Sequence, residues 1–185
     1  RAGVDIVTGD TKVVGKGMAD KIFITTTGIG IIPPNVSLSL RKIKEGDLVI
    51  LNGPIGDHGI AILMTREGIT LEGEIKSDSQ PLNLIVKEMI KIEGIRAMRD
   101  LTRGGLGAVL CEISSATGFS IHIEEEAIPI RPEVLSACEI LGLDPIYVAN
   151  EGKFIAIVSP EVGEEVLKVM RKREEGKEVR KEMRR

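Results

Sequence analysis

The sequence predicts an α+β fold in which helices flank a mixed β-sheet. Two observations carry this prediction: short runs of β-branched and apolar residues alternate along the chain with stretches whose apolar residues recur at helical spacing. Such elements bury their apolar faces by packing helices against a sheet. Neither a GxGxxG nor a P-loop motif accompanies them. The chain has 185 residues, enough for one domain and a short part of another.

The first part of the chain predicts two strands around a polar turn. Residues 3–7 form the first strand, residues 8–12 the turn, and residues 20–27 a second strand that is dense in β-branched side chains. Pro33-Pro34-Asn35 then interrupts regular structure and is the best candidate for a domain boundary.

Strands and helices interleave from about residue 40 onward. Strands are predicted at 47–51, just before Asp100, at 119–123 and at 154–158, and helices at 59–67, 82–90, 106–113, 132–141 and after Pro160. In the second helix, apolar residues follow the i, i+3, i+4, i+7, i+8 spacing of an amphipathic helix. Pro132 stands near the start of its helix, where proline is tolerated.

The last residues, 171–185, differ in character because they contain eight basic and four acidic side chains. A solvated helical extension with Glu/Lys pairs is one interpretation, with Val179 and Met183 as an apolar i, i+4 pair. A basic arm that binds a partner is the other. The predicted organisation is therefore 1–34 as the end of an N-terminal domain and linker, 35–170 as an α+β domain, and 171–185 as a charged helical tail.

Composition excludes several classes of protein. Lys+Arg 25 against Asp+Glu 28 gives a net charge of −3, so no overall basic surface indicates nucleic acid. Aromatic residues are only 2%, too few for stacking on single strands. No apolar run approaches the ~20 residues of a membrane span. Two cysteines, Cys111 and Cys138, both within predicted helices, indicate a reducing cytoplasm rather than a disulfide framework. The abundance of Ile, Lys and Glu favours a thermophilic source.

One candidate site is the turn Thr8-Gly9-Asp10-Thr11-Lys12. A carboxylate, a hydroxyl, an amine and a flexible glycine suit a site for a metal and a nucleotide, with Asp10 on Mg²⁺, Thr11 on phosphate and Lys12 against phosphate charge. The same residues are also ordinary turn chemistry.

A second candidate is the segment from Asp100 to Leu106, between a short strand and a helix. Thr102 could cap the helix, and Gly104 and Gly105 at its start would leave N–H groups open to an anion. Arg103 offers a bidentate fork for phosphate or carboxylate. The alternative is that the glycines only permit close packing of the helix on the sheet.

A third candidate is Glu151, which stands in Asn150-Glu151-Gly152-Lys153 at the entrance to a buried strand. It could be a general base or a plain turn residue. His58 and His122 lack the spacing of metal ligands. Asp78 is most simply a turn or capping residue before the helix at 82–90.

Six motifs in order resemble the HypE-type hydrogenase expression/formation proteins, of the superfamily that contains aminoimidazole ribonucleotide synthetase and selenophosphate synthetase. The motifs are Thr8-Gly9-Asp10-Thr11-Lys12-Val13-Val14, Phe23-Ile24-Thr25-Thr26-Thr27-Gly28-Ile29-Gly30, Gly56-Asp57-His58-Gly59-Ile60-Ala61, Ser77-Asp78 with Pro81-Leu82, Met98-Arg99-Asp100-Leu101-Thr102-Arg103-Gly104-Gly105-Leu106 and Ala149-Asn150-Glu151-Gly152-Lys153. The resemblance covers residues 2 to about 170.

The resemblance implies the fold of the C-terminal domain of aminoimidazole ribonucleotide synthetase. It also implies an enzyme that uses ATP and Mg²⁺ to dehydrate a carboxamide on its own terminal cysteine to a thiocyanate, for the cyanide ligands of [NiFe]-hydrogenase iron. Asp10 and Thr11 would face Mg²⁺ and phosphate, and Lys12 and Glu151 would handle the protons of the carboxamide. Asp100, Arg103 and Gly104-Gly105 would help to form the cleft between domains.

The implied partners are the carbamoyltransferase HypF, the HypC–HypD scaffold and a second copy of the protein. The family's N-terminal nucleotide loops and its terminal cysteine have no counterpart in this chain, so we expect the 185 residues alone to be inactive. Two alternatives are another ATP-dependent enzyme of the superfamily, of the selenophosphate synthetase or thiamine-phosphate kinase type, and a non-catalytic protein-binding domain.

Overall fold

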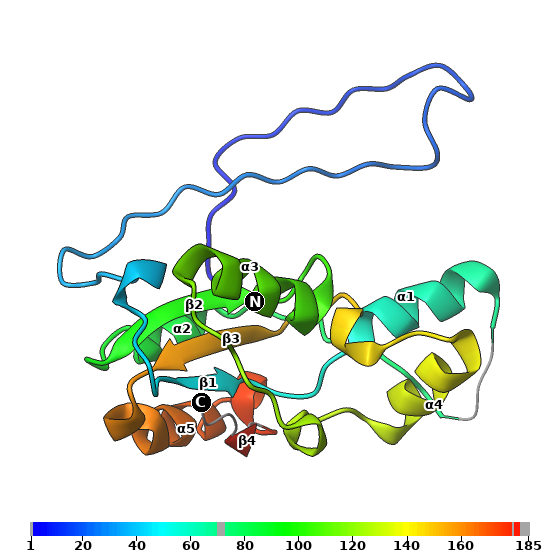
Figure 1. The fold of residues 1–185 in the computed structure, drawn as a ribbon. Coiled ribbons are helices and arrows are strands. Elements are labelled where there is room, and N and C mark those ends of the chain that lie inside the picture. Colours follow the sequence, from blue (N-terminus) through cyan, green and yellow to red (C-terminus); the bar gives the residue numbers. More distant parts are fainter. Residues whose placement is uncertain (1, 70–72, 179, 182–185) are drawn as a thin grey trace.

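A computed structural model describes residues 2–69, 73–178 and 180–181, and a four-stranded sheet lies at its centre (Figure 1). The strands are β1 (Leu48–Leu51), β2 (Ile95–Asp100), β3 (Phe154–Val158) and β4 (Arg180–Lys181), in the order β2-β3-β1-β4. All three strand pairs are antiparallel, whereas the sequence predicts a mixed sheet. Among the described residues, parallel pairing is confined to an isolated bridge between Ile55 and Ile130.

The antiparallel pairing brings three chain segments together at one end of the strands, which forms one edge of the sheet. Leu51 at the end of β1 is opposite Ile155, and Asp100 at the end of β2 is opposite Phe154. The residues that leave β1 and β2 therefore lie beside those that enter β3. This edge carries two of the polar motifs that the sequence singles out, those at Asp100 and at Glu151, and we call it the polar edge.

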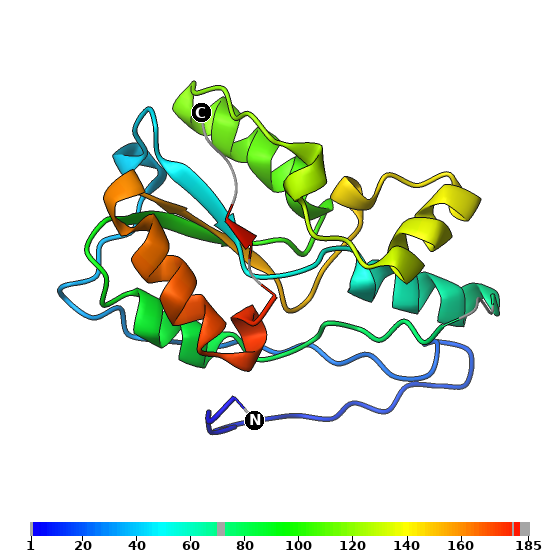
Figure 2. The same cartoon turned by 90° about the horizontal axis from the view of Figure 1, so that it is seen from below.

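Helices cover both faces of the sheet (Figure 2). Helices α2 (Asn83–Met89) and α5 (Gly163–Arg171) share one core with alternate strand residues such as Ile50, and α3 (Gly105–Thr117) shares another with their neighbours such as Val49. Successive side chains of a strand point to opposite faces, so a strand covered on both sides is apolar throughout. Strands β1 and β3 are accordingly buried at every position.

Two further helices, α1 (Asp57–Glu67) and α4 (Pro132–Leu141), pack on each other beside the polar edge (Figure 2). They enclose a small core of Ile60, Val134, Ala137 and Cys138. Burial raises the pKa of the Cys138 thiol, and Asp144 adds to the effect. Cys111 lies exposed on α3, and both cysteines are free thiols. None of the helices in the described residues is long and apolar enough to cross a bilayer.

The sequence predicts most of these elements correctly. The strand at 154–158 and the helix at 132–141 have the predicted bounds. The remaining helices and the two strands at 47–51 and before Asp100 are confirmed with shifts of a few residues at their ends. The helix after Pro160 begins as a 3₁₀ turn, Pro160–Val162, before α5.

The prediction of two strands near the N-terminus is wrong for this structure. Residues 2–32 form an extended excursion away from the sheet (Figure 1), and they contain no strand. Their apolar side chains are exposed, including Ile6, Phe23 and Ile29. A strand needs a neighbour that takes up its N–H and C=O groups, and no described segment pairs with this one. The proposed boundary at residue 34 stays a prediction.

Two other predictions are also corrected. Residues 119–123 are irregular, because Ile121 and Ile123 pack on the core beneath α3 without pairing to a strand. The described part of the tail does not continue as a helix: α5 is followed by a 3₁₀ turn at Glu174–Gly176 and by β4, which pairs with β1. The free edge of β1 offers the tail hydrogen bonds, while exposed i, i+4 pairs stabilise a helix only weakly. Val179 and Met183 lie outside the described residues.

Candidate functional site

The candidate site is built around the turn that leads into β3. Asn150 is fully buried there, and its side chain joins three segments. Its Oδ1 accepts a hydrogen bond from the Gly56 N–H at 2.8 Å, while its Nδ2 donates to the carbonyl oxygens of Val148 at 3.0 Å and Leu101 at 3.3 Å. Asn150 therefore fixes the turn relative to the start of α1 and to the end of β2.

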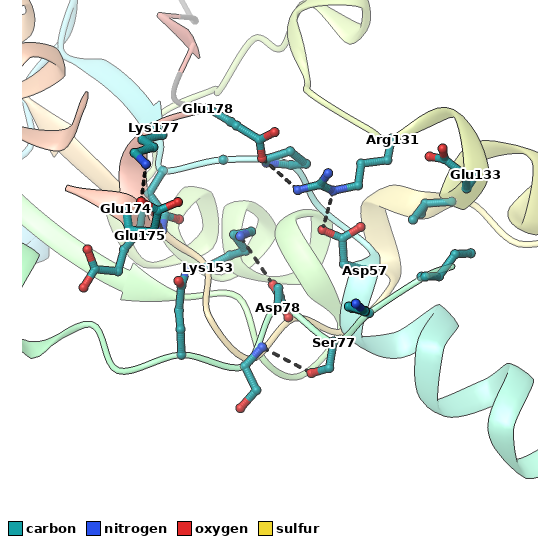
Figure 3. Close-up of a pocket in the computed structure, with 18 of the residues that line it drawn as sticks. Asp57, Ser77, Asp78, Arg131, Glu133, Lys153, Glu174, Glu175, Lys177 and Glu178 are labelled. Carbon is teal, nitrogen blue, oxygen red and sulfur yellow. Dashed lines mark hydrogen bonds and ion pairs between the residues drawn. The ribbon is translucent and has the colours of Figure 1, made fainter. Parts of the chain in front are cut away.

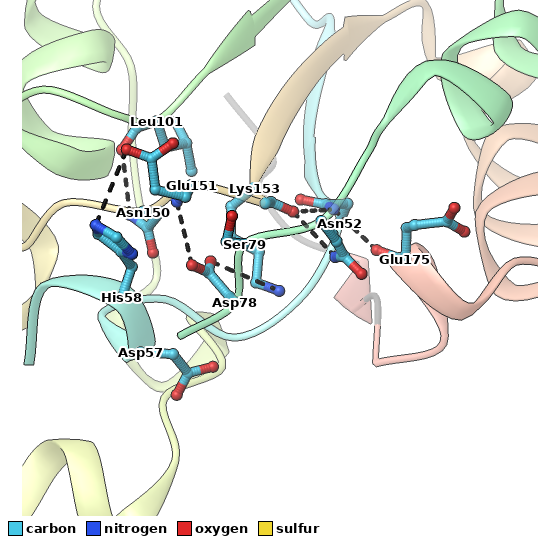
Figure 4. A network of polar contacts seen from close by, with 12 residues as sticks. Asn52, Asp57, His58, Asp78, Ser79, Leu101, Asn150, Glu151, Lys153 and Glu175 are labelled. Atoms are coloured by element: carbon cyan, nitrogen blue, oxygen red, sulfur yellow. Dashed lines mark hydrogen bonds and ion pairs between the residues drawn. The ribbon is translucent and has the colours of Figure 1, made fainter. Parts of the chain in front are cut away.

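Glu151 follows Asn150 and directs its side chain toward α1 (Figure 4). Its backbone N–H donates to Asp78 Oδ1 at 3.1 Å. Its Oε1 lies 3.9 Å from His58 Nε2, and 42% of the side chain is exposed. The backbone of Glu151 is thus held in place while its carboxylate stays partly exposed.

His58 lies in the first turn of α1 and meets the loop at residues 77–80. Its Nδ1 is 2.8 Å from Ser77 Oγ, and Ser77 Oγ also accepts a hydrogen bond from the Ser79 N–H at 3.2 Å. The imidazole therefore stands between the Ser77 hydroxyl and the Glu151 carboxylate.

The loop at 77–80 packs directly on Gly152, and this contact explains why a glycine stands there. A Cβ at position 152 would lie 1.9 Å from the backbone oxygen of Asp78. The carbonyl of Gly152 accepts hydrogen bonds from Gln80 Nε2 and from Asn52 Nδ2, each at 3.2 Å. The Asn52 Oδ1 in turn accepts from the Phe154 N–H at 2.8 Å, so the end of β1 is tied to the same turn.

A cleft of about 600 Å³ opens beside this turn (Figure 3). Two ion pairs with buried carboxylates lie in its wall. Lys153 Nζ is 3.8 Å from Asp78 Oδ2, and both side chains are buried. Arg131 Nε donates to Asp57 Oδ2 at 3.1 Å, and Arg131 Nη2 donates to Glu178 Oε2 at 2.9 Å. Burial raises the pKa of Asp57, while the Arg131 guanidinium acts in the opposite direction.

The charge of the cleft argues against a triphosphate there. Seven carboxylates and four cationic side chains line it: Asp57, Glu74, Asp78, Glu133, Glu174, Glu175 and Glu178 against Lys76, Arg131, Lys153 and Lys177. This excess of negative charge repels phosphate. Within the described residues no group of three His, Cys, Asp or Glu side chains could hold a metal ion.

The structure places the predicted residues Asp10, Thr11 and Lys12 on the exposed N-terminal excursion. The Thr11 N–H donates to Asp10 Oδ1 at 2.9 Å, which is a local turn contact. No hydrogen bond or ion pair joins Lys12 to Glu151 in the part of the chain that is described. The structure therefore does not bring these two predicted residues together.

The predicted residues Asp100, Arg103, Gly104 and Gly105 lie at the end of β2 and the start of α3, on the same polar edge as Glu151. Thr102 does not cap α3 as predicted. Its Oγ1 donates to Asp100 Oδ2 at 2.7 Å, and the N-cap position is Gly104. The hydrogen bond from Thr102 lowers the pKa of Asp100.

The two glycines at this helix start have a clear packing role. A Cβ on Gly105 would lie 2.6 Å from the backbone oxygens of both Ile146 and Val148. Both glycines have positive φ values, +70° for Gly104 and +62° for Gly105. Close packing of the helix start therefore requires glycine here, whatever further role the N–H groups have. Arg103 is exposed beside them.

Sequence reasoning missed several residues of this site. Asp78 is not a cap, since the N-cap of α2 is Leu82; it is a buried acceptor for Glu151 and a partner of Lys153. His58 and Asn52 were not among the predicted site residues. A usable signal existed, because Asn52 and Lys153 directly adjoin two wholly apolar strands, where buried polar residues need partners.

Comparison with known proteins identifies the family of proteins to which this fold belongs. Residues 44–180 match the family described as "AIR synthase related protein, C-terminal domain", and the chain belongs to this family. Within it, the chain is similar to HypE-type proteins. It is 52% identical over 178 residues to the hydrogenase expression/formation protein HupE of Azotobacter chroococcum mcd 1, a match that covers 96% of this chain and 52% of the relative. It is 51% identical over 172 residues to the carbamoyl dehydratase HypE of Bradyrhizobium diazoefficiens, covering 92% of the chain and 50% of the relative.

Solved structures agree with this assignment. The crystal structure of Escherichia coli HypE matches with a TM-score of 0.79 and 39% identity, over 82% of this chain and 47% of that one. A HypE structure in complex with ATP matches with a TM-score of 0.74 and 38% identity, over 78% and 43%. These findings confirm the resemblance and the α+β class. The chain spans about half the length of the curated relatives that it matches.

Proposed function

We propose that this chain is the C-terminal part of an ATP-dependent carbamoyl dehydratase of hydrogenase maturation. The reaction would convert a cysteine-bound carboxamide to a thiocyanate and so supply the cyanide ligands of the hydrogenase iron. Sequence identities of 52% and 51% to HypE-type relatives support the assignment. The structural observation that carries it is Glu151, an accessible carboxylate whose backbone is fixed at the polar edge.

Glu151 is the base in this proposal. Conversion of a carboxamide to a nitrile removes both hydrogens from nitrogen, so the site needs groups that accept protons. A carboxylate that is 42% exposed on a rigid turn can reach a substrate laid along the polar edge. Lys12 would be the second residue to handle these protons, once it is brought to the same cleft.

The nucleotide site would lie mostly outside the described acid-rich cleft. Asp10 and Thr11 would contribute to binding Mg²⁺ and ATP, and Asp100, Arg103, Gly104 and Gly105 would form one wall of the cleft between domains. A relative of this chain has been solved with ATP, which supports the nucleotide. The 185 residues alone would be inactive.

The proposed partners follow from the same relatives. A HypE–HypF complex, in which HypE matches this chain with a TM-score of 0.74 and 41% identity, supports HypF as a partner. The HypC–HypD scaffold as recipient, a homodimer, a cytoplasmic location and a thermophilic source complete the proposal. Another enzyme of the superfamily and a non-catalytic binding domain stay as alternatives, and the identity to HypE proteins favours the first proposal over both.

The test is single-turnover dehydration in the whole protein that carries this chain, loaded with the carbamoyl group and followed by mass spectrometry for loss of water. We expect Glu151→Gln to lower the rate about 10²–10⁴-fold, the usual contribution of a positioned base, with ATP binding unchanged. Lys12→Ala should impair both ATP use and the rate. Glu139→Gln, on the exposed face of α4, is the matched control. A wild-type rate for Glu151→Gln would disprove the assignment.

A second test addresses the isolated 185 residues. Calorimetry with ATP and Mg²⁺ should show no submicromolar binding, because the large cleft is acidic and Asp10–Lys12 lies on an exposed segment. Tight binding would mean that the nucleotide site is placed incorrectly.

A further inference from the structure

The Glu151 carboxylate forms an ion-pair contact with His58, a residue of α1. Asp78 binds only the backbone N–H of Glu151, so it fixes the position of the turn but leaves the carboxylate free to rotate. His58 Nε2 lies 3.9 Å from Oε1 of Glu151 (Figure 4), which is longer than a hydrogen bond, so the two groups face each other without a direct bond in this structure. The imidazole is therefore placed to influence the orientation of the carboxylate.

The hydrogen bonds of Ser77 are compatible with a tautomer of His58 in which Nε2 carries the hydrogen. Ser77 Oγ accepts the Ser79 N–H, and the hydroxyl can donate its own hydrogen to His58 Nδ1, which lies 2.8 Å away. A neutral imidazole has one donor and one acceptor nitrogen. With Nδ1 as the acceptor, Nε2 carries the hydrogen and presents it to Glu151, which is the arrangement that a carboxylate favours.

We propose that His58 is a positioning residue for the reaction, held by Ser77 so that its Nε2–H orients the Glu151 carboxylate toward the substrate. This inference rests on the proposed function, because it assigns a helper to the base of that reaction. His58 would not itself touch the substrate. The other charged groups near it are Asp57 in the same helix turn, Asp78 in the facing loop, and Lys153, which pairs with Asp78.

The loop at 77–80 makes this arrangement a single unit. Ser77 holds the imidazole, and the next residue, Asp78, holds the backbone of Glu151. One loop therefore sets the distance between the base and its positioning residue. The exposed fractions of 23% for His58 and 42% for Glu151 show that the pair faces the accessible side of the edge and is not part of an apolar core.

The test uses a double-mutant cycle in the carbamoyl-loaded whole protein. We expect His58→Ala to lower the single-turnover rate about 10²-fold, the cost of a small misplacement of a reacting group, while the ATP concentration for half-saturation is unchanged. His58→Gln should restore most of the rate, because its amide can donate a hydrogen to Glu151. Ser77→Ala should lower the single-turnover rate by a smaller factor, again with the ATP concentration for half-saturation unchanged. In the Glu151→Gln background, His58→Ala should cost nothing more, since its effect acts through Glu151.

Two controls separate the possible outcomes. His122→Ala, at an exposed histidine remote in sequence, should leave the rate unchanged, and thermal midpoints should show that every variant is folded. A wild-type rate for His58→Ala, or full additivity with Glu151→Gln, overturns the inference. If Glu151→Gln itself has no effect, the proposed function fails instead, so the two failures are distinguishable.

Discussion

Asp78 and Glu151 are joined by a hydrogen bond although they lie 73 residues apart in the chain: Asp78 Oδ1 accepts from the backbone N–H of Glu151 at 3.1 Å. Asp78 Oδ2 faces Lys153, two residues further along the same turn. The buried Asp78 carboxylate in the loop at 77–80 therefore holds the backbone of Glu151, the proposed base, and also pairs with the Lys153 ammonium. The loop and the turn should respond to mutation as a unit.

The Lys153–Asp78 pair provides the first prediction. Lys153→Met should lower the free energy of unfolding by about 3 kcal/mol, because it leaves the Asp78 carboxylate buried without a cation. Adding Asp78→Asn should recover much of this loss, since the uncompensated charge is removed. Urea denaturation measures both effects. Lys91→Met, in the exposed pair of Lys91 with Glu88, is the control and should be close to neutral. Equal losses in the single and double variants would contradict the account.

The close approach of the loop to Gly152 gives the second prediction. Gly152→Ala should cost about 3 kcal/mol, because its Cβ would overlap the backbone oxygen of Asp78 and backbone cannot move aside as a flexible side chain can. Gly53→Ala at the same edge is the matched control. Its Cβ would meet Lys153 Nζ at 3.6 Å, an ordinary contact. Comparing the thermal midpoints of the two variants tests the contact, and similar midpoints would mean that the loop does not pack on this turn.

The raised pKa of Asp57 predicts a pH dependence of stability. Because burial raises this pKa, the folded state holds the proton more tightly than the unfolded state does. The contribution of Asp57 to the free energy of unfolding is then fully present below the pKa that Asp57 has in the unfolded chain. It is lost as the pH rises through the pKa that Asp57 has in the folded protein. Asp57→Asn should therefore gain stability relative to wild type as the pH rises through this window. Denaturation from pH 3 to pH 8 measures it, and a constant difference would refute it.

The stability contribution of Asp100 should depend on pH in the opposite direction, so Asp100 serves as the control for that experiment. The hydrogen bond from Thr102 lowers the pKa of Asp100, so its contribution is present above the pKa of the unfolded chain and is lost as the pH falls through the folded value. Asp100→Asn should thus lose stability at neutral pH and approach wild type in acid.

Hydrogen exchange of the N-terminal excursion gives the fourth prediction. Amides of residues 4–32 in the isolated chain should exchange almost as fast as in an unfolded peptide, because their described backbone makes few hydrogen bonds. Residues 155–158 of β3, paired on both sides, should be the slowest. Strand addition between two copies of the chain would instead protect the excursion. Slow exchange across residues 22–27 in a demonstrated monomer would contradict both expectations.

Much of the domain could be predicted from local sequence. The strand at 154–158 is a continuous apolar run, and the helix at 132–141 has a proline at its start and a glycine after its end, so each element carries its own signals. The six ordered motifs were sufficient to indicate the family. They were sufficient because each motif is a short stretch whose residue types and order can be compared without knowing the fold.

Tertiary structure alone decided which of these residues meet. Residues 20–27 have the composition of a strand but form none, because strand pairing requires a partner that sequence composition does not specify. Asp78 looked like a turn residue, and only the packing of its loop on Gly152 makes it the buried acceptor for Glu151. Likewise His58 has no metal-ligand spacing in the sequence, yet antiparallel pairing of β1 with β3 places it beside Glu151. Residue types and local periodicity determine elements, whereas contacts between residues that are distant in the chain depend on the register and packing of those elements.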